Sequence, residues 1–350
     1  MTDNSAAANT ANTANTANTA NTANSENTPA HTPPLHGAID VHAHFFTARL
    51  CAAMRDAGVI RPDGMPAIPD WDPKSALRHM GEVGIETAML SVSSPGIDFG
   101  TPDAVRELAR NVNDEGAALV RAHPGRFGLL ASLPLPDLPA SLAEAERALD
   151  ELGADGIALH THYQGHYLGD PLYEPLMELL DDRHAVVFLH PTSPQCWKDT
   201  SLGYPSPMIE FPFDTTRAVA HLILSGTLRR HPHISFVIPH AGAALPVLAD
   251  RIAVFALMRE DGPPVDVMAD LATLHFDLAG FSLPRALPAL LNLTDARHLL
   301  YGSDFPFTPD WAVEGLARPL VDAVDPAVRA DLLHGNARRL FPRLSEPRGA

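Results

Sequence analysis

The chain has little cysteine, little positive charge and no long apolar run. Its only two cysteines, Cys51 and Cys196, exclude a disulfide framework, and neither has an adjacent base that would make it a nucleophile. The 25 basic residues against 42 acidic ones give a net charge of −17, which argues against nucleic acid as a partner. No apolar segment approaches the roughly 18 residues of a membrane span, and no signal peptide is recognisable. We therefore expect a cytoplasmic protein without membrane contact.

The first 36 residues differ in composition from the rest of the chain. Ala-Asn-Thr repeats between Ala8 and Asn24, and the segment has almost no large apolar side chains. Such a segment cannot offset the entropy of its own ordering, so we predict a disordered tail over 1–36. A folded domain is expected over 37–342, followed by a short C-terminal tail over 343–350.

Strand-like and helix-like segments alternate through the folded part. Helical spacing or caps predict helices over 104–121, 141–153, 215–230 and 245–259. The long stretches 45–75 and 191–214 look like loops. Continuous apolar runs predict eight buried strands, over 38–43, 86–92, 127–133, 156–160, 185–189, 234–239, 274–279 and 299–303. This α/β pattern predicts a single (β/α)8 TIM-type barrel, because no glycine-rich phosphate loop supports the rival doubly wound sheet.

Three histidines and one aspartate stand where predicted strands end. His42 and His44 end the first strand, His190 ends the fifth and Asp304 ends the eighth. The carboxyl ends of barrel strands meet at one mouth, so these side chains can share one divalent cation. An isolated His-x-His pair is a weak signal, and barrel-lining histidines with hydrogen-bond partners are the alternative. The donor set suits Zn²⁺ best, while Mn²⁺ is possible.

Other histidines are candidates for different roles. His240 also ends a strand, where it would act as an acid or base beside the metal. His162 belongs to a second His-x-His with His160; since strand four offers no bridging carboxylate, we expect one metal, with His162 as a substrate contact. The histidines predicted to be structural or solvated, on helices or turns, are His166, His184, His221, His231, His233 and His334.

Several motifs in order give the chain a family likeness. They are Ile39–Phe46 (IDVHAHFF), 190–192 (HPT), 240–242 (HAG) and 302–306 (GSDFP). Over 37–342 the chain resembles the amidohydrolase superfamily, in the branch of aminocarboxymuconate-semialdehyde and salicylate-type decarboxylases, with the 6-methylsalicylate type nearest. The resemblance implies a mononuclear metal site of the residues named above, with His240 as acid/base. It also implies a homodimer in which Arg251 holds a substrate carboxylate in the neighbouring subunit's site, although a solvated helix-surface arginine is the alternative.

These observations predict a metal-dependent, non-oxidative decarboxylase of a hydroxybenzoate-like aromatic acid. Asp304 and His240 are the candidate proton carriers. Phe46 is expected to contact the substrate in a flat apolar pocket formed with Phe45, Phe211, Phe213 and Phe305. One alternative is a metal-dependent hydrolase that opens a lactone or amide at the same site. Another is a metal-binding protein without catalytic activity.

Overall fold

The computed structural model describes residues 33–344, which belong to one compact unit that begins at Pro33. Its main sheet has eight parallel strands in the order β1-β2-β3-β4-β7-β8-β9-β10. All eight predicted strands are present, with ends shifted by at most a few residues. Their bounds are β1 Ala38–His44, β2 Ile85–Ser91, β3 Phe127–Ser132, β4 Gly156–His160, β7 Val186–His190, β8 Ser235–Ile238, β9 His275–Asp277 and β10 Leu299–Leu300.

The sheet closes on itself between its first and last strands. The backbone N–H of Val41 donates to the carbonyl of Tyr301 at 2.9 Å, and the N–H of Asp304 donates to the carbonyl of His42 at 2.8 Å. Ala43 also forms a parallel bridge with Phe305. The segment that follows the short strand β10 therefore lies against β1, and the predicted (β/α)8 barrel is confirmed.

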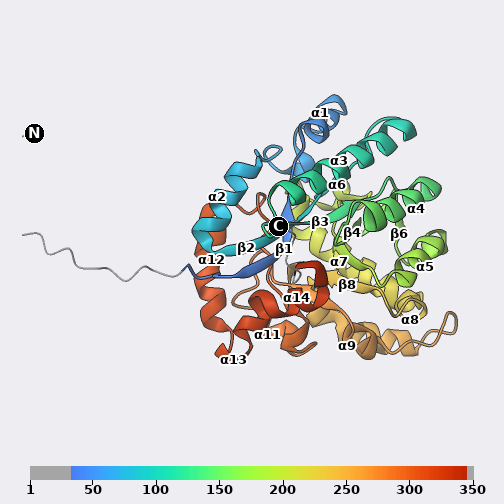
Figure 1. Cartoon of the computed structure of the whole chain (residues 1–350). Coiled ribbons are helices and arrows are strands. Elements are labelled where there is room, and N and C mark those ends of the chain that lie inside the picture. Colours follow the sequence, from blue (N-terminus) through green and yellow to red (C-terminus); the bar gives the residue numbers. More distant parts are fainter. Residues whose placement is uncertain (1–32, 345–350) are drawn as a thin grey trace, which may run out of the picture. The chain divides into compact units, whose positions relative to one another are not determined.

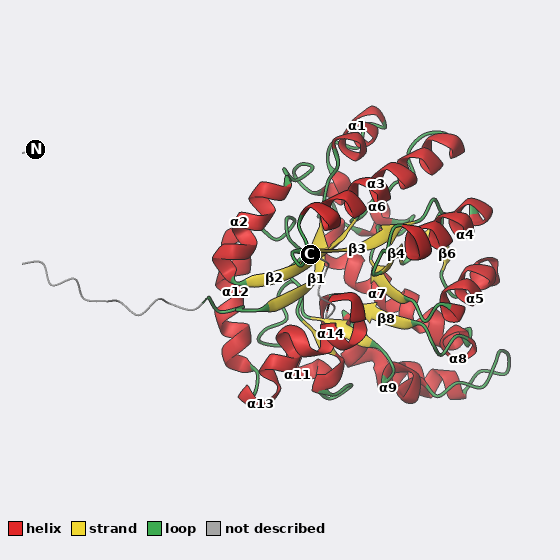
Figure 2. Cartoon of the chain, viewed as in Figure 1, coloured by secondary structure: helices red, strands yellow, loops and turns green. Residues whose placement is uncertain are grey.

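Helices surround the strands on the outside (Figures 1 and 2). Thr101 caps α3 and accepts a hydrogen bond from Ala104 N at 3.3 Å. The predicted helix 215–230 is instead two helices, because the chain turns at Gly226 with φ of 78°. The helices are α1 Ala48–Asp56, α2 Pro73–Val83, α3 Pro102–Ala122, α4 Leu138–Glu146, α5 Glu174–Asp182, α6 Trp197–Thr200, α7 Ser206–Leu224, α8 Thr227–Arg230, α9 Leu245–Leu257, α10 Val267–Leu271, α11 Ala286–Leu290, α12 Asp310–Ala323, α13 Pro326–Ala330 and α14 Asn336–Leu340.

Four further expectations about local structure were wrong. The stretches 45–75 and 191–214 contain helices α1 and α6 and the starts of α2 and α7. The second predicted helix, 141–153, begins three residues early, because Asp137 caps α4. His166 lies in neither a helix nor a turn, because β5 His162–Tyr163 and β6 His166–Tyr167 form a small antiparallel hairpin. The folded part also begins before Gly37, since Leu35 is fully buried and its N–H donates to Val83 O at 3.1 Å. The rest of the predicted tails, 1–32 and 345–350, lies outside the described residues.

Two apolar layers hold the barrel together. One layer lies between the strands and the surrounding helices. The other fills the barrel interior with side chains such as Val41, Met89 and Phe188, and includes Ala337 of α14 and the adjacent Phe341. In Figure 1, α14 lies in front of the strands rather than in the outer ring of helices. Because the C-terminal segment packs into this interior layer, one end of the barrel is filled. The open mouth of the barrel is therefore at the other end.

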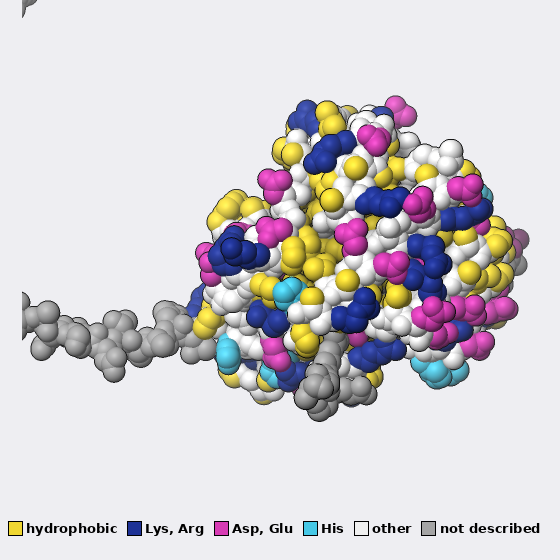
Figure 3. Space-filling view, turned by 45° about the horizontal axis from the view of Figure 1, so that its top comes forward, with side chains coloured by type: hydrophobic (Ala, Val, Ile, Leu, Met, Phe, Trp, Pro, Cys, Tyr) yellow, Lys and Arg dark blue, Asp and Glu magenta, His cyan; other side chains and the backbone are white. Residues whose placement is uncertain are grey.

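Charged side chains of both signs lie on the surface (Figure 3). Basic and acidic side chains are interspersed on the face shown in Figure 3, without a continuous basic area. Within residues 33–344, no helix combines the length and apolarity needed to cross a membrane.

Candidate metal centre

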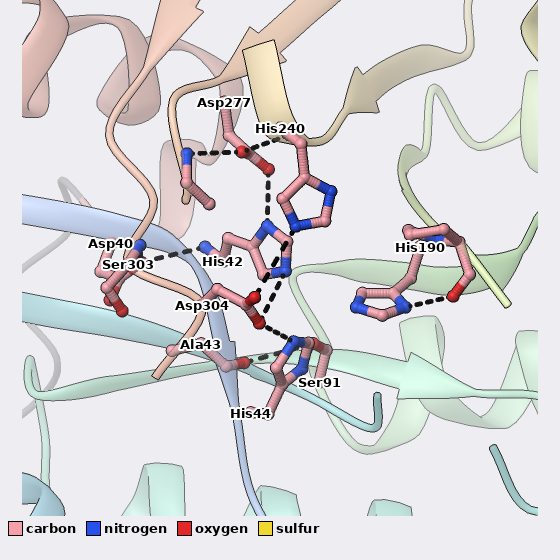
Figure 4. A network of polar contacts seen from close by, with 12 residues as sticks. Asp40, His42, Ala43, His44, Ser91, His190, His240, Asp277, Ser303 and Asp304 are labelled. Atoms are coloured by element: carbon pink, nitrogen blue, oxygen red, sulfur yellow. Dashed lines mark hydrogen bonds and ion pairs between the residues drawn. The ribbon is translucent and has the colours of Figure 1, made fainter. Parts of the chain in front are cut away.

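Four predicted ligand side chains meet at the open end of the barrel. His42 and His44 come from β1, His190 from the end of β7, and Asp304 from the segment after β10. One ligand atom from each side chain lies within 4.8 Å of all the others. Asp304 Oδ1 is 3.1 Å from His44 Nε2 and 3.5 Å from His42 Nε2 (Figure 4). The three histidines are buried, so the group lies at the bottom of the mouth rather than on its rim.

Each histidine ring is oriented through its Nδ1 atom. His42 Nδ1 lies 2.9 Å from Asp277 Oδ2, and His190 Nδ1 lies 2.7 Å from the carbonyl of Pro191. His44 Nδ1 lies 3.0 Å from Ser91 Oγ, whose own hydrogen is donated to the backbone. The partners of His42 and His190 can only accept, so Nδ1 carries a proton in these two rings. Ser91 Oγ can accept from His44 Nδ1 while it donates to Ala43 O, and this arrangement would leave His44 Nε2 to a cation. The three Nε2 atoms face the space beside Asp304, as metal-ligating histidines require.

One buried atom lacks a partner in a way that a metal ion would explain. His42 Nε2 is buried and has no hydrogen-bond partner among the described residues. Leaving a buried polar atom unpaired costs about 1–3 kcal/mol, so such atoms are uncommon without a functional reason. Three imidazole nitrogens and one carboxylate oxygen are a donor set that zinc and similar divalent ions accept. The residues present fit one divalent cation.

Charges within the group are strongly coupled. Burial lowers the pKa of His42, but the carboxylates of Asp277, Asp304 and Asp40 outweigh it and raise the pKa to about 9. Burial and the neighbouring histidines hold the pKa of His190 well below its usual value. Burial alone would raise the pKa of Asp304, but hydrogen bonding to His240 and the charges of nearby histidines keep it well below its usual range. Asp304 is therefore an anion that can bind a cation.

The backbone of Asp304 adopts a left-handed conformation with φ of 61°. Its N–H donates to His42 O, and its own carbonyl accepts from Thr308 N at 2.8 Å. Immediately before it, Ser303 donates to the buried carboxylate of Asp40 through both N–H, at 3.0 Å, and Oγ, at 2.5 Å. These bonds hold a conformation that non-glycine residues rarely adopt, and they aim the Asp304 carboxylate at the histidines.

Sequence reasoning missed Asp277, Asp40 and Ser91, the residues that orient the ligands. Asp277 Oδ1 also accepts from the backbone N–H of His240 at 3.0 Å and of Ala279 at 2.9 Å. Both aspartates lie inside predicted apolar strands. A charged residue within a buried strand is costly unless it is paired, and that was the available signal for both aspartates.

His240 lies beside the group of four rather than within it. Its Nε2 is 3.7 Å from Asp304 Oδ2, and its Nδ1 has no hydrogen-bond partner within residues 33–344. The backbone of His240 is also left-handed, with φ of 55°, and its N–H is held by Asp277. The same carboxylate thus positions both His42 and His240.

A cavity of about 510 Å³ lies against His190, His240 and Asp304. Its walls are largely apolar and include Phe211 and Phe307. The volume is in the range of small-ligand sites. The cavity can therefore hold a molecule of one aromatic ring next to the candidate metal ligands.

Most of the aromatic residues predicted to form the pocket lie elsewhere. Phe46 is not among the lining residues; it is buried behind Phe307, with ring centroids 5.8 Å apart. Phe45 is buried in the outer core, Phe213 is about half exposed, and Phe305 stacks on His79. Of the five predicted phenylalanines, only Phe211 lines this cavity.

The other two predicted substrate contacts also lie outside this cavity in a single chain. His162 is turned away by the β5–β6 hairpin: its Nε2 lies 3.2 Å from Ser193 O, and its Nδ1 accepts from Gly165 N at 3.3 Å. It lines a separate hollow of about 120 Å³. Arg251 is on the exposed side of α9, with its guanidinium 4.9 Å above the Phe255 ring. Arg251 is not among the residues that line the cavity of its own chain.

Known proteins share both the sequence and the fold. The amidohydrolase family model matches residues 39–343. A 6-methylsalicylic acid decarboxylase of Aspergillus aculeatus is 37% identical over 325 residues, which cover 87% of this chain and 96% of the relative. A solved amidohydrolase structure is 35% identical, covers 89% of this chain and 100% of its own, and superposes with a TM-score of 0.83.

A more distant solved structure shares the fold. It is a dihydroxybenzoic acid decarboxylase from a Polaromonas species, crystallised with bound manganese and the inhibitor 2-nitroresorcinol. Its TM-score is 0.75 at 23% identity, and the match covers 88% of this chain and 97% of its own. At this identity the likeness concerns the arrangement of the barrel.

Proposed function

The chain belongs to the amidohydrolase family, and from that membership we propose that it is a metal-dependent, non-oxidative decarboxylase of a hydroxybenzoate-like acid. The relative from Aspergillus aculeatus acts on 6-methylsalicylic acid, and we assign the same substrate type to this chain. The observation that carries the proposal is the meeting of three Nε2 atoms and one carboxylate at the base of a cavity for one ring. Among them, the buried His42 Nε2 has no hydrogen-bond partner in residues 33–344.

We propose His42, His44, His190 and Asp304 as the ligands of one divalent cation. Zinc suits this donor set best, and manganese is the alternative, supported by the ion in the Polaromonas structure. When bound, the cation supplies a Lewis acid that draws in the carboxylate and ortho-hydroxyl oxygens of the substrate and stabilises their negative charge.

The reaction needs a proton at the ring carbon that bears the carboxylate. Once that carbon is protonated, the bond to the carboxylate breaks, its electron pair returns to the ring, and carbon dioxide leaves. We assign this proton transfer to His240 Nε2, which borders the cavity and lies 3.7 Å from Asp304 Oδ2. Asp304 is the less suitable donor because its pKa is held well below the usual range. A positioned acid of this kind contributes about 10²–10⁴-fold to a rate.

The rest of the cavity would orient the ring. Phe211 and Phe307 provide flat apolar contacts beside the candidate ligands. A methyl group such as that of 6-methylsalicylate can be buried against these rings at a gain of about 0.8 kcal/mol per carbon. Holding the ring still while the proton is delivered is the main contribution expected of these walls.

An activity panel with metal analysis tests the proposal. Purified protein loaded with Zn²⁺ or Mn²⁺ should release carbon dioxide from 6-methylsalicylate, and His42→Ala and Asp304→Ala should lose bound metal and turnover together. Ser282→Ala, a change in the cavity wall away from the ligands, should keep its metal. Base consumption with lactones in place of carbon dioxide release would establish the hydrolase instead. Metal binding without turnover of any acid in the panel would favour a binding protein.

We further propose that the chain acts as a homodimer in which Arg251 serves the partner's site. Its support is the position of Arg251 on an exposed helix face, among exposed apolar side chains that include Val254, Phe255 and Leu257. Sedimentation should give twice the chain mass. A monomer with full activity would contradict this assignment.

A further inference from the structure

The catalytic cavity is poorly suited to attract an anion by itself. No lysine or arginine is among its described lining residues, whereas the carboxyl groups of Asp63 and Asp304 both border it. The whole chain carries a net charge of −17. An aromatic carboxylate approaching this protein is therefore repelled at long range, and it meets no lysine or arginine of the same chain in the cavity wall before it reaches the candidate metal ligands.

A second hollow, of about 400 Å³, lies next to this cavity and has the opposite character. Its lining includes two cations, Arg61 and Lys198, and two aromatic rings, Trp197 and Tyr204. No carboxylate is among the described residues that line it. Lys198 is one of only two lysines in the chain. We name this hollow, lined by Arg61, Trp197, Lys198 and Tyr204, the cationic groove.

Neither cation of the cationic groove pairs with a carboxylate of the described residues. Across residues 33–344, Arg61 and Lys198 form no ion pair, and both are exposed. Tyr204 is 55% exposed, so its ring is accessible to a ligand. Cations free of internal partners beside open aromatic rings match a planar acid, whose carboxylate and ring they can contact together.

The close approach of Gly64 to Pro205 lies between the cationic groove and the catalytic cavity. Gly64, with φ of 81°, approaches Pro205 so closely that a Cβ at Gly64 would lie 3.1 Å from Pro205 Cα. On one side of this contact, Asp63 and Met65 line the catalytic cavity. On the other side, Gly64 and Pro205 themselves line the cationic groove. The two hollows therefore share one thin wall.

We propose that the cationic groove is a capture site for aromatic carboxylates, which bind there before they pass the Gly64–Pro205 contact into the catalytic cavity. The identification of this ligand as substrate rests on the proposed function. The binding itself does not, because it needs neither the metal nor turnover. Arg61 and Lys198 neutralise the carboxylate, and Trp197 and Tyr204 contact the ring.

Binding of a small fluorinated acid to the metal-free protein tests the capture site. The probe is 4-fluorobenzoate, followed by ¹⁹F line broadening, and 4-fluorobenzyl alcohol is its neutral counterpart. We expect the acid to bind more tightly than the alcohol, with an affinity that falls as salt screens the two cations. Arg61→Gln/Lys198→Gln should weaken binding of the acid about tenfold at low salt and leave the alcohol unchanged.

A matched variant separates local contacts from total charge. Lys74→Gln/Arg78→Gln removes the same two charges from α2, and neither residue lines the groove. This variant should bind 4-fluorobenzoate like the wild type. If both double variants bind 4-fluorobenzoate equally well, or lose affinity for it equally, the proposed capture site is refuted. Trp197→Ala should also weaken binding, and unchanged affinity there would remove the aromatic contact from the proposal. Since no turnover is measured, failure of the decarboxylase proposal would not alter these outcomes.

Discussion

Replacing Asp277 by asparagine should weaken metal binding although Asp277 is not a candidate ligand. The carboxylate accepts from His42 Nδ1 at 2.9 Å and from the N–H groups of His240 and Ala279. In Asp277→Asn, the amide oxygen can keep both backbone bonds, which leaves the NH₂ group facing His42. Two donors then oppose each other, and the favoured response is a change of tautomer that puts the His42 proton on Nε2. That proton occupies the lone pair proposed for the metal.

The loss of metal affinity in Asp277→Asn depends on pH. Asp277 orients His42 for the metal, but it also stabilises the protonated form of His42 that competes with the metal. Loss of a group that orients a metal ligand typically costs 10–100-fold in affinity, or about 1.4–2.8 kcal/mol. Asp277 also helps to raise the pKa of His42 in the metal-free protein to about 9, so in the wild type a proton competes with the metal below that pH. Removing Asp277 relieves this competition and offsets part of the loss. The competition disappears as the pH rises through 9.

We therefore expect Asp277→Asn to bind metal about tenfold more weakly at pH 7 and closer to 100-fold more weakly at pH 9. Metal affinity is measured by competition with a chelator of known strength at each pH. Asp214→Asn is the matched control, because Asp214 is equally buried and bonds Tyr167 and Arg217 rather than a candidate ligand. Wild-type affinity in Asp277→Asn at both pH values, or an equal loss in Asp214→Asn, would refute the reasoning.

Three further changes have defined outcomes. His240→Ala should retain its metal and lose about 10²–10⁴-fold in turnover, measured by carbon dioxide release, whereas loss of metal would make His240 a ligand. Glu174→Gln should lower the free energy of unfolding at pH 7 by about 1 kcal/mol, since hydrogen bonding to Arg230 lowers the pKa of Glu174 to about 2 on a partly exposed side chain. That contribution is present above the ordinary value of 4.5 and is lost as the pH falls towards 2, so urea unfolding should show the two proteins converging between pH 5 and 3. Leu35→Ala should cost about 2–5 kcal/mol in the same assay, because the side chain is fully buried, and a change below 0.5 kcal/mol would show that this segment does not pack in solution.

The sequence was sufficient to predict where the candidate ligands meet, because strand ends are readable from composition. His42, His44, His190 and Asp304 each follow an apolar run, and parallel strands bring their carboxyl ends to one mouth. That argument needs only the order of the strands and the closure of the barrel. It does not require the register of any strand pair.

Side-chain partners could not be predicted in the same way because they depend on register and on local irregularity. The pairing of β1 with β2 shifts between Asp40 and Ala43, at the point where the chain passes from Val41 in the interior to the histidines of the mouth. Whether Ser91 would meet His44 depends on that shift. His162 was misplaced for a related reason, since the two-residue strands of the β5–β6 hairpin are too short to leave a hydrophobic pattern.

The orientation of the candidate metal ligands depends on the choice of Nδ1 partners. Each ring is held by a different kind of group: a carboxylate for His42, a hydroxyl for His44 and a backbone carbonyl for His190. Only the carboxylate changes the charge of the site, so it should tune metal affinity most, whereas Ser91→Ala should mainly loosen the His44 ring. Because Asp277 also holds the backbone of His240, one carboxylate sets the position of a candidate ligand and of the candidate proton carrier. Movement of Asp277 would then displace both at once, which couples metal binding to proton delivery within a single strand end.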